Sequence, residues 1–185
     1  SDVYKRQEER ISYLIEAAVL ADQGGDAALA GTLFTRALDE AGDDQTLAAR
    51  VRMRRAGFYA DHERWEDAQE AIDPVLFITG QPTEQRARAV LLYERICAEL
   101  DQPPERLDAV FAELSDLPDA EAELRMSLAE VRSAQGAIDA AMAELSLIEG
   151  LTISSDLSLR VLETRSRVQD RGGDLAGSAE SLAAL

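Results

Sequence analysis

The chain has 185 residues, the length of one ordinary domain, and its acidic residues outnumber its basic ones so far that the net charge is −17. So acidic a surface is repelled by a phosphate backbone, so we expect no nucleic-acid binding. Because the chain has one cysteine and one histidine, it cannot form an internal disulfide or a metal site built from several thiolates or imidazoles. The sequence contains no stretch of about 18 apolar residues, so we expect no membrane span.

The composition predicts an all-α protein, since helix-forming Ala, Leu, Glu and Arg dominate and aromatic residues make up 5% of the chain. Residues 1–7 (SDVYKRQ) hold the single lysine and do not match the Arg-rich remainder. We interpret them as a tail introduced by cloning or sequencing and residues 8–185 as a single helical repeat domain. The C-terminus stops within an apolar helical pattern, so we expect the chain to be a piece of a longer protein.

Two short stretches repeat each other, Asp22–Asp26 (DQGGD) and Asp170–Asp174 (DRGGD). Glycine adopts the left-handed conformation that ends a helix, and the aspartate after it is a good N-cap for a following helix. Each stretch therefore predicts a tight turn between two helices. Residues 134–137 predict a third such turn, and residues 62–65 and 101–104 occupy the equivalent places in the middle of the chain.

The helices around the first turn show a regular spacing of large and small residues within residues 11–44. One face of each helix carries the following residues: Leu14, Ala18 and Ala21 before the turn, and Ala30, Phe34 and Ala37 after it. Small residues at Ala18 and Ala30 allow two antiparallel helices to approach closely. This spacing resembles the tetratricopeptide repeat (TPR), in which such residues recur over roughly 34 positions.

Four further pairs follow in chain order, at about 49–80, 90–117, 122–151 and from 159 onward. The third is the weakest match and fits only with an extra residue in its turn. The equivalent small residues are taken as Ala30, Ala68, Val110, Ala141 and Ser178. The resemblance implies an all-α, right-handed α-solenoid of about five antiparallel helix pairs, with nine or ten helices, no strands and no internal domain boundary.

The loops between pairs are predicted at residues 80–83, 117–119 and 154–156, with Thr83 and Asp119 as N-caps. Pro74 is expected to interrupt or kink the second helix of the second pair.

The residues that could carry chemistry have structural explanations. His62 lies at a predicted turn, where we expect it to be solvated. Cys97 occupies a small-residue position and is expected to pack in the core. Acidic pairs are numerous because 36 acids cover helical surfaces. Phosphate-binding loops and nucleophile motifs are absent from the sequence. We therefore predict no enzyme activity, no cofactor and no metal site.

The first helix of each pair lines the concave groove in the family that the chain resembles. Carried over by position, the groove residues are Ile15, Val19, Arg50, Met53, Arg54, Leu91, Glu94, Arg95, Glu123, Met126, Glu130, Arg160, Glu163 and Arg167. From these, the candidate peptide-binding groove consists of Arg50, Met53, Arg54, Leu91, Arg95 and Met126. Its three arginines would form a basic spot that binds an acidic peptide or a C-terminal carboxylate. Alternatively, these arginines form ion pairs within the chain.

The leading hypothesis is a non-catalytic scaffold that binds a protein or peptide in this groove. A second is a sensor or regulatory segment of a larger bacterial multidomain regulator, and a third is an enzyme fragment or a small-molecule-binding domain. The excess of arginine over lysine and the lack of disulfides favour a bacterial, cytoplasmic protein. A periplasmic location stays open if a leader precedes the chain. The apolar C-terminal helix suggests self-association into a homo-oligomer.

Overall fold

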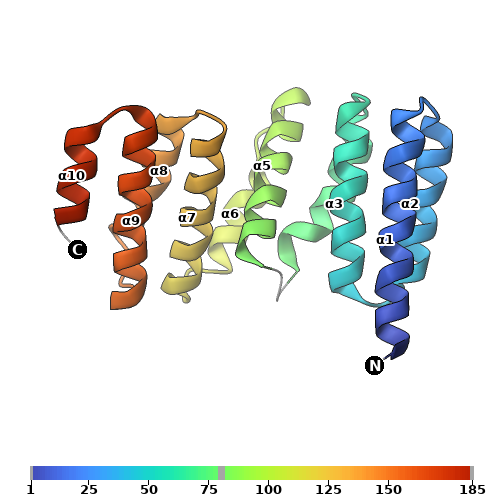
Figure 1. Cartoon of the computed structure of the whole chain (residues 1–185), viewed down its shortest axis with the longest axis horizontal. Helices are drawn as coiled ribbons and strands as arrows, with labels where there is room; N and C mark the ends of the chain where they lie inside the picture. The colour runs from blue at the N-terminus through green and yellow to red at the C-terminus, as the bar shows by residue number, and fades with distance from the viewer. Residues whose placement is uncertain (1, 79–81, 184–185) are drawn as a thin grey trace. The chain divides into compact units, whose positions relative to one another are not determined.

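The structure of the protein is a computed structural model that describes residues 2–78 and 82–183 (Figure 1). Within this part of the chain every regular element is a helix, so the all-α prediction is confirmed. The elements are α1 (Asp2–Gln23), α2 (Ala27–Ala41), α3 (Gln45–Asp61), α4 (Trp65–Ile72), the 3-10 helix η1 (Asp73–Phe77), α5 (Thr83–Glu99), α6 (Glu105–Ala112), α7 (Pro118–Ala134), α8 (Ile138–Ile148), α9 (Ser155–Gly172) and α10 (Leu175–Ala183).

The chain forms two compact units. Unit 1 consists of Ser1–Gln81 and Leu92–Pro104, and unit 2 consists of Pro82–Leu91 and Glu105–Leu185. Helix α5 contributes its first half to unit 2 and its second half to unit 1. That residues 8–185 form a single domain stays a prediction.

Five turns of one kind divide the helices into pairs. At each turn one residue has a positive φ: Gly25, Glu63, Asp101, Gly136 and Gly173. The N–H of the next residue donates to the carbonyl five positions earlier, at 2.8 to 2.9 Å, as in Asp26 N to Ala21 O. This is the bond that closes a helix end when one residue is left-handed. All five predicted turns are therefore present, 35 to 38 residues apart.

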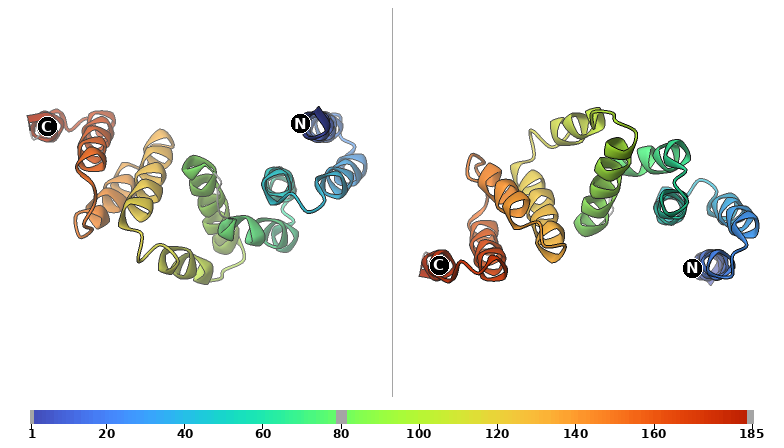
Figure 2. Two further views of the ribbon diagram at one scale, coloured as in Figure 1. Left: turned by 90° about the horizontal axis from the view of Figure 1, so that it is seen from below. Right: turned by 90° about the horizontal axis from the view of Figure 1, so that it is seen from above.

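In unit 1, helix α2 lies between the first helices of two successive pairs. It packs against α1 and α3, and α1 also contacts α3 (Figure 2). Ala18 and Ala30 are fully buried, as the predicted close approach of α1 and α2 requires. On the other side of α2, the ring of Phe34 lies 5.4 Å from that of Phe58 on α3. Each pair is thus covered by the helix that follows it.

Unit 2 repeats this arrangement with α7, α8 and α9, and α10 packs against α9. An apolar cluster lies between these three helices. Its buried members are Ala122, Met126, Ala129, Ala141, Leu145, Ile148, Leu157, Val161 and Val168. Here too the second helix of one pair, α8, is buried by the first helix of the next.

The packing of one pair on the next buries a particular position, the ninth residue after the residue of positive φ in each turn. It is Phe34, Ile72, Val110 and Leu145 in the first four pairs, and all four are buried. In the fifth pair it is Leu182, which remains 52% exposed. Within the described residues, the large apolar residue at this position is buried in each of the four pairs that a further described pair follows.

The third pair departs from the others at its two small positions. Counted from the turn, the small residue of the second helix is Ala30, Ala68, Ala141 and Ser178 in the other pairs and Arg106 in this one. The prediction that Val110 is the small residue was therefore wrong, because Val110 is the large buried residue. The matching position of the first helix is Glu94, where other pairs have Ala18, Ala56, Ala129 and Ser166. Two charged residues at small positions explain why the sequence match is weakest here.

Helix α4 ends at Ile72 and continues as the 3-10 helix η1, which contains Pro74 near its start, so the predicted interruption at Pro74 is confirmed. The two N-cap predictions are wrong. Asp119 is not an N-cap, because α7 begins at Pro118 and Leu117 is its N-cap. Thr83 is the first residue of α5 and therefore not its N-cap. The predicted loop residues 80–81 lie outside the described residues.

Residues 2–7, which the sequence analysis set aside as a tail, form the first turns of α1. The side-chain amide of Gln7 donates to the backbone carbonyl of Glu40 at the end of α2, at 2.7 Å. This end of the segment therefore takes part in the packing of the first pair.

The conformation of the turns leads to a stability prediction for two glycines of the first pair. An added Cβ at Gly25 or at Gly31 meets no atom within 4 Å, but only Gly25 has a positive φ. Gly25→Ala should lower the free energy of unfolding by about 1 kcal/mol because an L-residue is strained there. Gly31→Ala, within α2, should raise it by about 0.5 to 1 kcal/mol. Urea unfolding followed by circular dichroism measures both, and equal changes would contradict the assignment of the turn.

Candidate functional site

The candidate site lies on the first helices of the pairs, whose registers the turns align. The tenth residue before the turn is Ile15, Met53, Leu91, Met126 and Glu163 in the five pairs. All five were predicted to line the groove, and each occupies the same place on its own helix. Unit 1 contains Ile15 and Met53, and unit 2 contains the other three.

Equivalent places do not have equal exposure. Met126 is only 6% exposed and belongs to the core cluster of unit 2, between α7 and its neighbours. Ile15 is buried as well, whereas Met53 and Leu91 are half-buried and Glu163 is exposed. The assignment of Met126 to a peptide-binding groove is therefore wrong for this structure, since its thioether is used in packing and leaves too little surface for a ligand.

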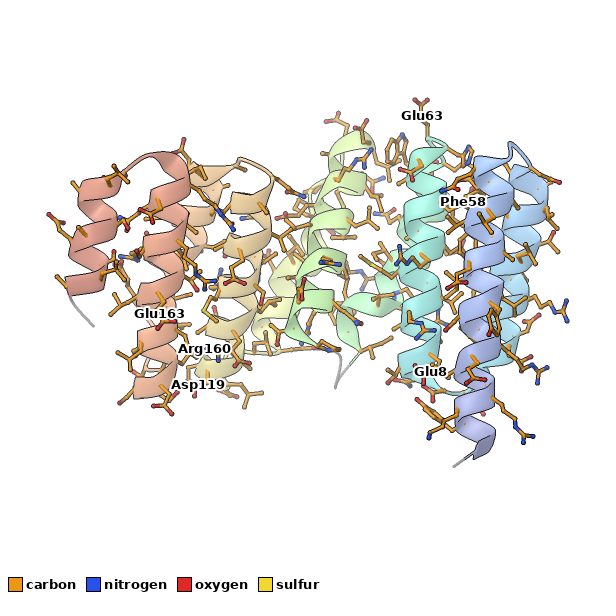
Figure 3. The ribbon with its side chains drawn as sticks, viewed as in Figure 1. Glu8, Phe58, Glu63, Asp119, Arg160 and Glu163 are labelled. Atoms are coloured by element: carbon orange, nitrogen blue, oxygen red, sulfur yellow. The ribbon has the colours of Figure 1, made fainter. Side chains whose placement is uncertain are left out.

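Arg50 on α3 is held by the neighbouring first helix. Its guanidinium lies 3.3 Å from the carboxylate of Glu8 and also donates to the hydroxyl of Ser12, both on α1. Glu8 is the labelled residue near the lower end of α1 in Figure 3. Arg50 thus joins successive pairs, which is the alternative that the sequence analysis left open for the groove arginines.

Arg54 lies one helical turn beyond Arg50 and so on the same face of α3. It is exposed and forms no hydrogen bond or ion pair with any residue in the described ranges. Met53 lies beside it on the helix. Arg95, on the part of α5 that belongs to unit 1, is exposed too, but its guanidinium lies 5.5 Å from the centre of the Trp65 ring.

In unit 2 the predicted groove charges of α7 and α9 pair with each other. Glu123 lies 3.1 Å from Arg160, and Glu130 lies 2.9 Å from Arg167. Asp119 accepts a hydrogen bond from the backbone N–H of Ser154 at 2.9 Å. Asp119, Arg160 and Glu163 are labelled in Figure 3 on this face of the unit. We call the three α7–α9 contacts and the Glu8–Arg50 contact the first-helix ladder.

A less exposed ionic cluster connects α7 to α8. The two carboxylate oxygens of Glu144 accept from Arg125 at 3.0 Å and from Arg132 at 2.8 Å. Arg125 also pairs with Glu121 at 2.8 Å, and its guanidinium lies 4.0 Å from the centre of the Phe111 ring. This cluster was not predicted from the sequence. Its signal is a pair of arginines two helical turns apart on α7 together with Glu144 in the middle of α8, whose other charged residue is Asp139 near its start.

His62 and Cys97 have structural contacts. The Nε2 atom of His62 lies 2.6 Å from a carboxylate oxygen of Asp22, near the turn of the preceding pair, and its ring packs edge-on against Phe58. His62 is exposed, as predicted, yet it is partnered. Cys97 is buried, and the side-chain amide of Gln69 lies 3.9 Å from its sulfur.

Two kinds of feature are absent from the described residues. Within residues 2–78 and 82–183, no three His, Cys, Asp or Glu side chains come together in a way that could hold a metal ion. In the same ranges, no helix has both the length and the apolar character to cross a bilayer.

Comparison with models of known protein families gave no match, and comparison with curated protein sequences gave none either. The class that the structure supports is therefore the coarse one, an all-helical chain whose helices follow one another through five equivalent turns. That class rests on the five equivalent turns, the repeated three-helix packing and the ladder between first helices.

The cluster around Glu144 predicts an unequal response to two acid-to-alanine changes. Glu144→Ala leaves two nearly buried arginines without their shared carboxylate, so the free energy of unfolding should fall by about 3 kcal/mol. Glu149, also on the α8 side, pairs with Arg165 but is 62% exposed, and Glu149→Ala should cost less than about 1 kcal/mol. Chemical denaturation compares the two, and a loss below 1 kcal/mol for Glu144→Ala would contradict the account of the cluster.

Proposed function

We propose that the chain is a non-catalytic, TPR-like repeat module, a right-handed α-solenoid of five hairpins, that binds an acidic protein segment on the first-helix face of α3. The observation that carries the proposal is the exposed guanidinium of Arg54, which has no partner among the described residues. It lies on the same face as Arg50 and next to the half-buried Met53. A negatively charged ligand would supply the contact that the chain leaves unmade.

The pairing of several other arginines supports this reading. In a protein of net charge −17, carboxylates are abundant near most surfaces, and Arg50, Arg125, Arg160 and Arg167 all pair with one. An arginine that stays unpaired on the ladder side of α3 is therefore available to a carboxylate from outside.

The chemistry of the face fits a peptide carboxylate. A guanidinium presents parallel N–H donors that match the two oxygens of a carboxylate. Met53 offers a flexible apolar surface beside the charge, which suits an adjoining side chain of the ligand. Arg50 adds positive potential near the site. Because it would have to give up its ion pair with Glu8 to contact the ligand, we expect it to contribute less to the binding free energy than Arg54.

The proposed site is narrower than the one predicted from the sequence. Arg54 and Met53 form its centre and Arg50 its edge, whereas Met126 is excluded by burial. Arg95 and Leu91 lie on α5 and not on the α3 face, so the proposed site does not include them. A bacterial, cytoplasmic protein remains part of the proposal, on the arginine bias and the single cysteine.

Binding of a fluorescein-labelled oligoglutamate peptide with a free C-terminal carboxylate, measured by fluorescence anisotropy, tests the proposal. Arg54→Glu should raise the dissociation constant about tenfold or more, because a hydrogen bond to a charged group contributes about 1.5 to 3 kcal/mol. Arg36→Glu is the matched control: Arg36 is exposed on α2 and has no partner among the described residues.

The control separates a local site from overall charge, since both variants change the net charge equally. Weaker binding of Arg54→Glu alone supports the site. An equal loss of affinity in both variants would mean that overall charge, and not a site at Arg54, determines the binding. No measurable binding of the peptide to the unsubstituted chain would overturn the proposal.

A further inference from the structure

Helix α1 carries an uncovered apolar face. Tyr13 and Leu20 lie two helical turns apart and are 68% and 66% exposed. We call this pair of residues the leading face. Its polar neighbours on the same helix do not shield the ring or the isobutyl group from water.

The same two positions are covered in later first helices. Counted from the turn, Tyr13 corresponds to Val51 on α3 and to Val161 on α9, and Leu20 corresponds to Phe58 and Val168. All four are buried. Because α2 packs on α3 and α8 packs on α9, the positions of the leading face are those that the second helix of a preceding pair covers.

Helix α10 carries the complementary uncovered face. Leu175, Ala179 and Leu182 are all exposed and recur at helical spacing. We call these three residues the trailing face. Leu175 corresponds to Ile138 on α8 and Leu182 to Leu145, both of which pack in the core that α8 forms with α9. A Cβ added to Gly172 at the end of α9 would lie 2.8 Å from Ile138, which shows how closely α9 covers that end of α8.

Among the described residues, a trailing-type surface packs on a leading-type surface at α2–α3 and at α8–α9, whereas no described residue covers the leading face of α1 or the trailing face of α10. We propose that the trailing face of α10 binds the leading face of α1 in a second copy of the chain. The contact is head-to-tail, so it continues the internal repeat of apolar faces from one molecule to the next. It places Leu182 and Leu175 against Tyr13 and Leu20.

Charge and size set the strength of this association. Each copy carries a net charge of −17, so two copies repel each other and added salt screens that repulsion. Two helix faces bury less surface than a standard stable interface, so the association is weak and depends on protein concentration. Its dependence on protein concentration distinguishes this association from an obligate oligomer. Its strengthening by salt distinguishes it from an association through ion pairs, which salt weakens.

Sedimentation velocity of the purified chain over a wide range of concentration, at low and high salt, tests the proposal. The unsubstituted chain should show a mass that rises with concentration and rises further with salt. Leu182→Glu and Leu20→Glu should each raise the dissociation constant at least about tenfold, since a buried leucine contributes about 1.5 to 3 kcal/mol. Leu147→Glu, on α8, changes a leucine of matched exposure, 54%, outside both faces and should leave the mass unchanged.

Mixing the two defective variants is the decisive step. Each retains one intact face, so an equimolar mixture should form a dimer and nothing larger. A mixture that stays monomeric, although the unsubstituted chain associates, would overturn the head-to-tail contact. So would loss of association in Leu182→Glu with no effect in Leu20→Glu, which indicates symmetric pairing of α10, and so would an unsubstituted chain that is monomeric at all concentrations.

Discussion

The structure depends on one constraint: the apolar face of each second helix is too large to stay in water, and its own first helix covers only part of it. The ninth residue after the turn shows this. Phe34 and Leu145 are each covered by packing that includes the first helix of the next pair, α3 or α9. The residues of each turn determine where the chain reverses direction between the two helices of a pair. Burial of the ninth residue after the turn holds the next pair in contact.

The same constraint explains where the charges lie. Once the first helices of successive pairs are brought side by side, their facing polar residues come within reach of each other, and the Glu8–Arg50, Glu123–Arg160 and Glu130–Arg167 pairs follow. These contacts are exposed and each contributes little to stability, but they use arginines that would otherwise attract ligands. A binding surface on the first helices therefore consists of what the ladder leaves free, and Arg54 is such a residue.

Much of the fold could be predicted from the sequence because the signals were local. The glycines at 25, 136 and 173 and the aspartates that follow two of them mark the turns directly, and the small residues Ala18 and Ala30 mark the close contact. The site could be predicted only in part. Helical register correctly aligned Met53 with Met126, but their exposure depends on how each helix packs, and the Glu144 cluster depends on which side chains meet across α7 and α8.

The most direct test of the central constraint compares two leucines at the same position of different pairs. Leu145 is fully buried with α9 packed on α8, and Leu182 is 52% exposed with no described helix beyond α10. At a concentration where the chain is monomeric, Leu145→Ala should lower the free energy of unfolding by about 3 kcal/mol, as for other buried leucines, and Leu182→Ala by less than about 1 kcal/mol. Equal losses at the two positions would contradict the account.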